Sequence, residues 1–433
     1  MNAEADRLSP DDARILALES AVLTGHTLKL MIVAPGTPVD LDALRTSVLA
    51  RVARQPRALQ RVEPATADTP ARWATAEHFD IAQHVRRRAG TDCATEKDLR
   101  RTVSTLMSEH LDRDRPLWTL DLIGPLADGR EAIAARMHHA MVDGIAGMRF
   151  LDEILLDPHE IPVHAVGVSA SIRPPDHQPW WRLPEAVARE LGRIGPRSPF
   201  DKPITVAREV AFTSAPLAEL KAIGASRPTH ATVNDVLLAV VAGGLHGWLA
   251  GRDALADVRA QIPVSLHHRE EQSTELGNHD SFINVDLPLA EPDPLRRLDL
   301  ISSQTRTEKK QGDAALLYEL FHALGSDRAV GEFARRIAGS SREFSVAISN
   351  VPGPRVAVSV AGRRVEQLYT SAEPGTHHAL RISAISNEAH VGIGFCTDPT
   401  ALPGIDGLAE GVGRAYAELR GAALGPGIAP SLQ

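Results

Sequence analysis

The chain has 433 residues, of which 43% are hydrophobic and 24% charged, so it can bury sizeable cores and is not a disordered sequence. Its formal net charge is −8 and no basic block is longer than Arg86-Arg87-Arg88, which removes the electrostatic footprint of a nucleic-acid-binding protein. Cys93 and Cys396 are lone thiols far apart in the sequence, so neither a disulfide framework nor a zinc site is expected.

The N-terminus and the apolar segments indicate where in the cell the protein is expected to be. Residues Met1 to Arg7 are polar and acidic, unlike a signal peptide. The longest apolar run, Val236 to Leu245, is too short to span a bilayer. We therefore expect a cytoplasmic protein that is soluble or lies on a membrane surface.

The N-terminal half, residues 8–156, is predicted to contain both helices and strands. Ser9 is placed to cap a first helix, with Pro10 at its first helical position. Apolar residues at helical spacing predict helices over 41–54 and 99–110, and apolar runs predict strands over 28–33, 118–124 and 132–138.

Residues 157–203 have a different composition. Nine prolines interrupt this stretch, which predicts a crossover linker with at most one helix, near residues 183–191. Trp180-Trp181 within it indicates that the linker packs against something rather than floating free.

The C-terminal half, residues 204–420, again mixes the two kinds of element. Its clearest helix is predicted over 232–249, and alternating polarity predicts a strand over 282–289. Further predicted elements are strands at 344–348, 378–385 and 390–396, and a last helix at 404–420. Residues 421–433 are predicted to be a flexible tail. Both halves therefore predict α/β layering.

A histidine doublet lies where the predicted strand 132–138 gives way to a helix. His138 and His139 are followed by Asp143 and Gly144. An imidazole titrates near neutrality, so it can take a proton from an alcohol or a thiol. Adjacent strand residues point to opposite sides, so only one of the two rings can face a reaction channel. Asp143 is a suitable N-cap for the next helix, and Gly144 lets the chain turn close to the site.

Three other short motifs stand out. Pro116-Leu117-Trp118 reads as a strand start with a buried indole, and Gly124 closes the same strand. Thr232-Val233-Asn234-Asp235 reads as a capping box at a helix start. Asn350-Val351-Pro352-Gly353-Pro354 reads as a turn that ends a strand. His267-His268 is followed by three charged residues, which predicts a solvated loop rather than a second site.

The pattern HHxxxDG at residues 138–144 resembles that of the CoA-dependent acyltransferase superfamily. PLWxxxxxG at residues 116–124 and NVPGP at residues 350–354 resemble the wax ester synthase/diacylglycerol acyltransferase family specifically. Pro263-Val264-Ser265 and Gly277-Asn278 fall in the expected order, so the resemblance extends from about residue 8 to residue 420.

The resemblance implies an α/β fold of two chloramphenicol-acetyltransferase-like subdomains with mixed sheets, joined by the crossover linker, with a tunnel between them. It implies that His139 is the general base and that His138 supports the site from the other face. The aspartate matching Asp143 is mainly architectural in the superfamily, often held by an arginine.

The resemblance also assigns roles to the other motifs. Trp118 would line the substrate channel or the core, and Asn234, next to Asp235, could donate a hydrogen bond near the reacting carbonyl. Pro116 and Leu117, and likewise Asn350, Pro352 and Gly353, would shape the site. One departure is Gly25-His26-Thr27, where many members have Met-His-Val-Gly. His26 could contribute to the pocket, but the favoured expectation is a surface histidine.

The implied reaction moves a long-chain acyl group from acyl-CoA to diacylglycerol or a long-chain alcohol, forming triacylglycerol or a wax ester. Acyl-CoA would be a cosubstrate, and no other cofactor, metal or nucleic acid is expected. A membrane or lipid-droplet surface is the expected partner, contacted through apolar segments such as Trp180-Trp181. Two alternatives stay open: a carrier-protein-dependent condensation-type or polyketide-modifying acyltransferase, and a non-catalytic lipid-binding protein.

Overall fold

The computed structural model describes residues 7–66, 69–92, 94–142, 144–159, 198–250, 258–265, 280–311 and 344–425. Several residues singled out above lie outside these ranges: Cys93, Asp143, Trp180-Trp181, His267-His268 and Gly277-Asn278. The helix predicted near 183–191 and most of the predicted linker also lie outside them, so the domain boundaries stay predictions.

The N-terminal half is built on a mixed sheet whose six strands run in the order β11-β12-β1-β6-β5-β4. Their bounds are β1 His26–Val33, β4 Val85–Arg87, β5 Trp118–Ile123, β6 Glu131–His138, β11 Ser359–Val360 and β12 Arg363–Ala372. Strands β4 and β5 are parallel, and the other neighbours are antiparallel. A separate hairpin pairs β2 (Gln60–Glu63) with β3 (Arg72–Thr75).

The C-terminal half has a second mixed sheet, in the order β7-β14-β13-β10-β8-β9. Its strands are β7 Glu209–Pro216, β8 Val258–Ser265, β9 Asp280–Leu287, β10 Val346–Val351, β13 Leu380–Ser386 and β14 His390–Thr397. Strand β10 is parallel to both β8 and β13, while the other pairs are antiparallel. The expected pair of α/β halves with mixed sheets is confirmed.

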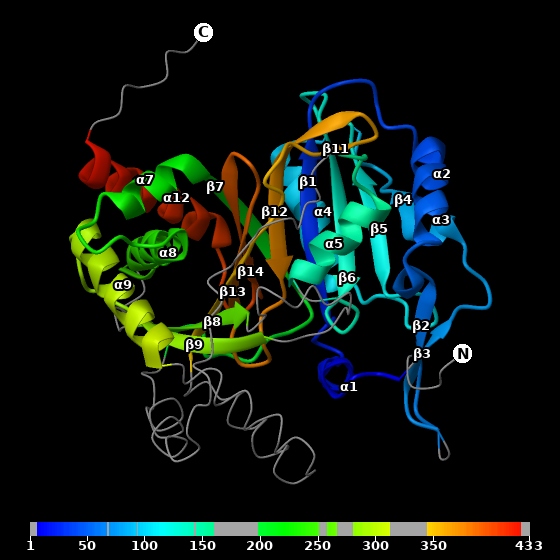
Figure 1. Cartoon of the computed structure of the whole chain (residues 1–433), viewed down its shortest axis with the longest axis horizontal. Helices are drawn as coiled ribbons and strands as arrows, with labels where there is room; N and C mark the ends of the chain where they lie inside the picture. Colours follow the sequence, from blue (N-terminus) through cyan, green and yellow to red (C-terminus); the bar gives the residue numbers. More distant parts are fainter. Residues whose placement is uncertain are drawn as a thin grey trace.

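Helices cover both sheets (Figure 1). Those of the N-terminal half are α1 Pro10–Leu18, α2 Leu41–Val52, η1 Pro56–Leu59, α3 Ile81–His84, α4 Glu96–Ser108 and α5 Gly144–Ile154. Those of the C-terminal half are α7 Leu217–Ala225, α8 Val233–Leu249, α9 Pro294–Gln311 and α12 Ile405–Leu424. The Ser9 hydroxyl accepts the Asp12 amide at 3.0 Å, which starts α1 at Pro10.

The start of the predicted tail needs correction, because α12 continues to Leu424 instead of stopping at residue 420. Ala422 and Ala423 extend it, and alanine is the best helix former. Gly425 then adopts φ 79°, a left-handed conformation that suits glycine at a helix end.

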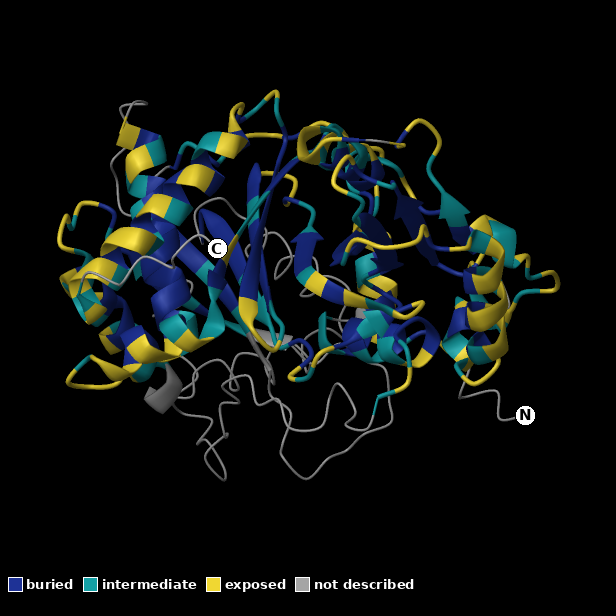
Figure 2. Cartoon of the chain, turned by 90° about the horizontal axis from the view of Figure 1, so that it is seen from above, coloured by how far each residue is buried: buried dark blue, intermediate teal, exposed yellow. Residues whose placement is uncertain are grey.

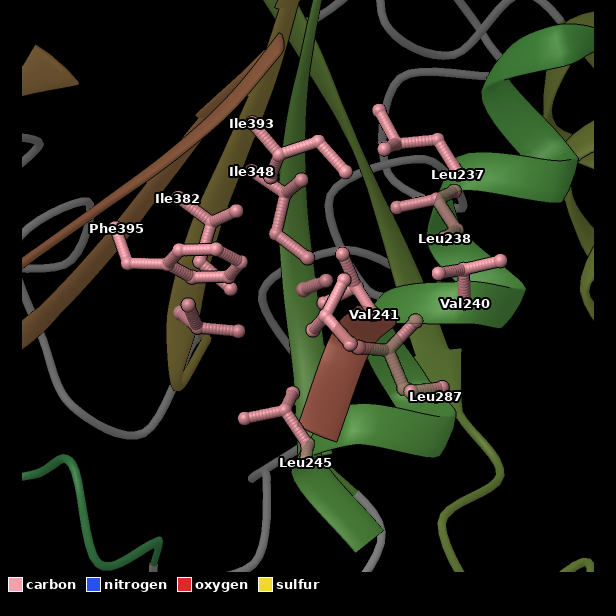
Figure 3. Close-up of a cluster of buried hydrophobic side chains, with 14 of the residues drawn as sticks. Leu237, Leu238, Val240, Val241, Leu245, Leu287, Ile348, Ile382, Ile393 and Phe395 are labelled. Carbon is pink, nitrogen blue, oxygen red and sulfur yellow. The ribbon is translucent and has the colours of Figure 1, made fainter. Parts of the chain in front are cut away.

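Helix α8 is apolar around most of its surface because it is buried against the second sheet. Figure 3 shows Leu237, Val241 and Leu245 of α8 across from the sheet residues Ile348, Ile382 and Phe395, and all six are at most 1% exposed. Burying one such side chain contributes about 1.5–3 kcal/mol. In Figure 2 the exposed residues lie mainly on the outer helices and loops, and the strands are mostly buried.

Strand β12 joins the two halves. It belongs to the C-terminal half in sequence, yet it pairs antiparallel with β1, from Thr27 opposite Ala372 to Val33 opposite Val365, and stands beside β1 in Figure 1. Two glycines of β14 let the backbone of β12 pass close to β14. A Cβ on Gly392 would lie 2.1 Å from the Leu368 oxygen of β12, and one on Gly394 would lie 2.1 Å from the Thr370 oxygen. The C-terminal half thus completes the N-terminal sheet.

Candidate active site

The histidine doublet lies at the end of β6, an interior strand that is buried along its whole length. Helix α5 begins at Gly144, so a short turn separates the doublet from the helix. The His138 amide donates to the Leu117 oxygen at 2.9 Å, and the His139 amide donates to the Gly25 oxygen at 2.8 Å. Neighbouring segments on both sides of β6 therefore fix the backbone of the doublet.

His138 is a buried, hydrogen-bonded ring with 1% exposure. Its Nδ1 accepts the Ala140 amide at 3.1 Å, so the proton lies on Nε2. Nε2 is 3.1 Å from Oε2 of Glu19 and donates to it. Both ring nitrogens are thus engaged within the protein, which suits a supporting role.

Glu19, just after α1, is held as a carboxylate. Burial raises its pKa, but the hydrogen bonds from His138 and Arg113 outweigh burial and hold the pKa below its ordinary value. Arg113 Nε lies 2.9 Å from Glu19 Oε2. The carboxylate therefore stays charged and keeps His138 in one tautomer.

His139 is half-buried, in contrast to His138. His139 lies in the turn that follows β6, and the alternation of side chains along a strand predicts that its ring faces away from the side of His138. One histidine of the doublet is thus fixed inside the fold, and the other is partly exposed although its Nδ1 is buried; a general base needs one ring nitrogen within reach of the acceptor. The role of base stays a prediction.

The NVPGP motif of the C-terminal half lies against the start of α5. A Cβ added to Gly144 would be 2.8 Å from Cγ2 of Val351, the last residue of β10. Gly353 is packed as tightly, since a Cβ there would lie 2.0 Å from the Ser386 oxygen. The segment from Asn350 through Pro352 to Gly353 thus lies beside the turn that carries the doublet, although it is over 200 residues away in sequence.

The Pro-Leu-Trp motif is part of the core. Pro116 is buried, Leu117 is 0% exposed and Trp118 is 1% exposed. The Trp118 indole Nε1 donates to the Ala58 oxygen at 2.9 Å, and its ring lies 4.5 Å from that of His84. Of the two roles that the sequence left open for Trp118, these contacts agree with the core role, and the channel role stays a prediction.

The Asn-Asp pair lies at the first turn of α8. Thr232 and Asp235 form the expected capping box. Asp235 is 2% exposed, and its Oδ1 accepts the Thr305 hydroxyl of α9 at 2.7 Å. These contacts make Asp235 a link between two helices. Asn234 is half-buried, and its expected hydrogen bond near the reacting carbonyl stays a prediction.

The expectation that His26 is a surface histidine is wrong. His26 is 1% exposed and lies opposite His138 in the pairing of β1 with β6. Burial and the nearby positive charge of Arg136 hold its pKa well below the ordinary value. The sequence around His26 is polar, and only the pairing with an interior strand explains its burial.

Three residues of the site were not foreseen: Glu19, Gly25 and Glu373. The Glu373 carboxylate accepts the Gly25 amide at 2.6 Å and the Thr24 amide at 2.8 Å. No local pattern could have found Glu373, because its partners are almost 350 residues away. The only signal for Gly25 was a glycine three residues before the predicted strand 28–33.

A cavity of about 550 Å³ lies elsewhere, between α2 and the β11–β12 hairpin, and includes Val39, Arg51 and Arg363 in its lining. The Val39 amide and Arg363 both bond to Glu131, the first residue of β6, so the cavity is at the opposite end of this strand from His138, about 23 Å along it. Its arginines bond to protein groups. We do not assign the reaction to this cavity.

Two further features concern the residues that the structure describes. None of the helices within these ranges is both long enough and apolar enough to cross a membrane. The same residues include no group of three or more histidine, cysteine, aspartate or glutamate side chains that could hold a metal ion.

Known proteins resemble the chain along most of its length. Residues 8–182 match the wax ester synthase/diacylglycerol acyltransferase catalytic domain, and residues 276–420 match the WS/DGAT C-terminal domain. A putative diacylglycerol O-acyltransferase of Mycobacterium tuberculosis is 30% identical over 386 residues, covering 78% of this chain and 75% of that protein. A second M. tuberculosis protein, a probable diacylglycerol O-acyltransferase, is 28% identical over 93% of this chain and 96% of its own.

Solved structures share the fold. A wax ester synthase/diacylglycerol acyltransferase from Marinobacter aquaeolei VT8 superimposes with a TM-score of 0.71 at 22% identity, covering 96% of this chain and 99% of that one. The first condensation domain of the CDA synthetase gives a TM-score of 0.61 at 18% identity, covering 95% of each chain.

Proposed function

The chain belongs to the wax ester synthase/diacylglycerol acyltransferase family, and from that premise we propose that it moves a long-chain acyl group from acyl-CoA to the hydroxyl of a lipid acceptor. The observation that carries the proposal is the doublet itself: His138 is fixed by Glu19, and His139 is partly exposed in the turn before α5, whose first residue, Gly144, packs against Val351. The acyltransferase family supplies the reaction class, and the site supplies a base.

The proposed chemistry needs a neutral His139. Its imidazole takes the acceptor's hydroxyl proton while the oxygen attacks the thioester carbonyl. The tetrahedral oxyanion collapses, the carbon–sulfur bond breaks, and the departing CoA sulfur takes the proton back from the imidazolium. A thioester is already activated, so the reaction requires no acyl-enzyme and no cofactor besides the cosubstrate. Holding both substrates at one site supplies the proximity contribution.

We propose diacylglycerol as the first acceptor to test and a long-chain alcohol as the second. The two mycobacterial relatives are named diacylglycerol O-acyltransferases, which favours the former. The products would be triacylglycerol and a wax ester, respectively.

The competing function is condensation-type transfer from a carrier protein, which the similarity to a condensation domain favours. The match of residues 276–420 to the WS/DGAT C-terminal domain weighs against it. The two are separated by comparing palmitoyl-CoA with a palmitoyl-loaded carrier protein as donor. A non-catalytic lipid-binding role would give no transfer from either donor.

The decisive experiment measures CoA thiol release from palmitoyl-CoA with dioleoylglycerol or hexadecanol, and the lipid product by chromatography. His139→Ala is expected to lower kcat at least about 100-fold, because general bases contribute 10²–10⁴-fold. His377→Ala is the matched control, since His377 is exposed. Full activity in His139→Ala would disprove the assignment of the base.

Both acceptors are apolar, so we propose that the protein works at the inner face of a membrane or at a lipid-droplet surface. The contact proposed is Trp180-Trp181, whose indoles suit the membrane interface. Replacing both with alanine is expected to release the protein from dioleoylglycerol-containing liposomes in a flotation assay. Equal flotation of the variant and the parent would contradict this contact.

A further inference from the structure

The Thr24–Gly25 segment lies between the doublet and a carboxylate of the C-terminal half. Gly25 has φ 70°, in the left-handed region that favours glycine. A Cβ on Gly25 would lie 2.3 Å from Nε2 of His138, so any larger residue would collide with that ring. The Gly25 oxygen in turn accepts the His139 amide at 2.8 Å. The conformation of this one peptide therefore affects both histidines.

Glu373 holds the other side of the segment. Its Oε1 accepts the Gly25 amide at 2.6 Å, and its Oε2 accepts the Thr24 amide at 2.8 Å and the Thr24 hydroxyl at 3.1 Å. A carboxylate that accepts several donors forms hydrogen bonds roughly twice as strong as neutral ones. Thr24 is 0% exposed, whereas Gly25 and Glu373 are half-buried, so these bonds are partly shielded from water.

Glu373 is itself fixed by the C-terminal half. It directly follows β12, the strand that completes the first sheet. The buried guanidinium of Arg208 lies 3.5 Å from Glu373 Oε2 and also donates to the oxygens of Val22 and Ala207. The carboxylate therefore has little freedom to move with the segment it holds.

We propose that Glu373 is a positioning residue for His139: it locks the Thr24–Gly25 peptide, whose oxygen holds the His139 backbone. The C-terminal half thereby sets the geometry of a base that the N-terminal half supplies. This inference rests on the proposed function, in which His139 removes the acceptor's proton. A small displacement of a catalytic group is costly, since misplacement by about 1 Å can lower a rate about 100-fold.

The test compares Glu373→Gln with Glu366→Gln, whose parent residue is exposed on the same strand. Glutamine keeps one acceptor oxygen but turns an amide group toward a backbone N–H, so one of the two backbone bonds is lost. With palmitoyl-CoA and dioleoylglycerol we expect kcat to fall about 10- to 100-fold. The KM for palmitoyl-CoA should stay within about twofold of the parent, because the change does not touch the donor.

Glu373→Asp keeps the charge and both acceptors on a shorter side chain, so it should recover part of the lost kcat. If Glu373→Gln is not obtained folded, Glu373→Asp decides alone, and its kcat should lie between those of the parent and His139→Ala. An unchanged kcat in a folded Glu373 variant, or a raised KM with kcat intact, overturns the inference.

His139→Ala separates this inference from the proposed function. If His139→Ala loses activity while the Glu373 variants keep full activity, the proposed base stays in place and only the positioning role is removed. Full activity in His139→Ala overturns both. Thermal unfolding of every variant is compared with that of Glu366→Gln, so a loss of folded protein is not mistaken for a loss of kcat.

Discussion

At Gly144 the two halves approach within the space of a single methyl group. In an ordinary helix, alanine is more stable than glycine by about 1 kcal/mol. Here an added Cβ would lie 2.8 Å from Val351 Cγ2, closer than side chains pack. Steric conflict with a β-branched residue at a strand end therefore opposes the helix preference, and forced overpacking typically costs about 1–3 kcal/mol.

We expect Gly144→Ala to lower both the free energy of unfolding in urea, by about 1–2 kcal/mol, and the rate of acyl transfer. Gly413→Ala in α12 is the control, because the nearest atom to its new Cβ is Thr213 Oγ1 at 3.7 Å; this variant should gain up to about 1 kcal/mol. Gly144→Ala combined with Val351→Ala should recover activity, since the clash is removed. If Gly144→Ala raised the free energy of unfolding as much as Gly413→Ala does, the close contact between Gly144 and Val351 would be contradicted.

Elements with strong local patterns were predictable, and those that depend on a distant partner were not. The apolar stripe of α8 and the alternation of β9 predicted both elements to within a few residues. Strand β12 was missed because Arg363, Arg364 and Glu366 give it a polar start. Its strand conformation comes from pairing with β1, a tertiary contact that no local window contains.

The residues of the candidate site also divide into those that the sequence could predict and those that it could not. The doublet, Gly144 and the NVPGP turn were recognisable from their sequence patterns, because each pattern is contiguous. Glu373 and Glu19 were not recognisable, because a single glutamate after a strand or a helix has no distinctive spacing. His26 was misplaced for a related reason: burial in the middle of a sheet depends on which strands are neighbours, and the sequence does not show strand order.

Across the whole molecule, each half holds a histidine that burial keeps neutral. In the N-terminal half His84 packs against Trp118 in a tilted arrangement with ring centres 4.5 Å apart, and in the C-terminal half His378 stacks on Phe344 at 4.1 Å. Burial lowers the pKa of each ring from 6.5 to about 4. Because the two residues lie in different halves, each half contributes one such group to the pH dependence of unfolding.

Proton linkage gives the direction in which the two histidines change the free energy of unfolding with pH. Between about pH 6.5 and pH 4, each histidine binds a proton in the unfolded chain but not in the folded one. Their stabilisation is therefore fully present above pH 6.5 and is lost as the pH falls toward 4, by about 1.4 kcal/mol per pH unit for each residue. The total is on the order of 3 kcal/mol for each histidine.

Urea unfolding between pH 4 and pH 8 tests this prediction. His84→Phe and His378→Phe keep an aromatic ring but cannot titrate, so each should reduce the acid-side slope by about 1.4 kcal/mol per pH unit. His78→Phe is the control, because His78 is exposed and does not contribute to the lowered pKa of either ring, and its slope should match that of the parent. Carboxylates that titrate in the same range, such as Asp201 with a pKa raised by burial to about 6, are common to all variants and cancel in the comparison. A parent slope that survives both phenylalanine substitutions would mean that neither ring is kept neutral by its burial, and that the acid sensitivity of the fold lies in other groups.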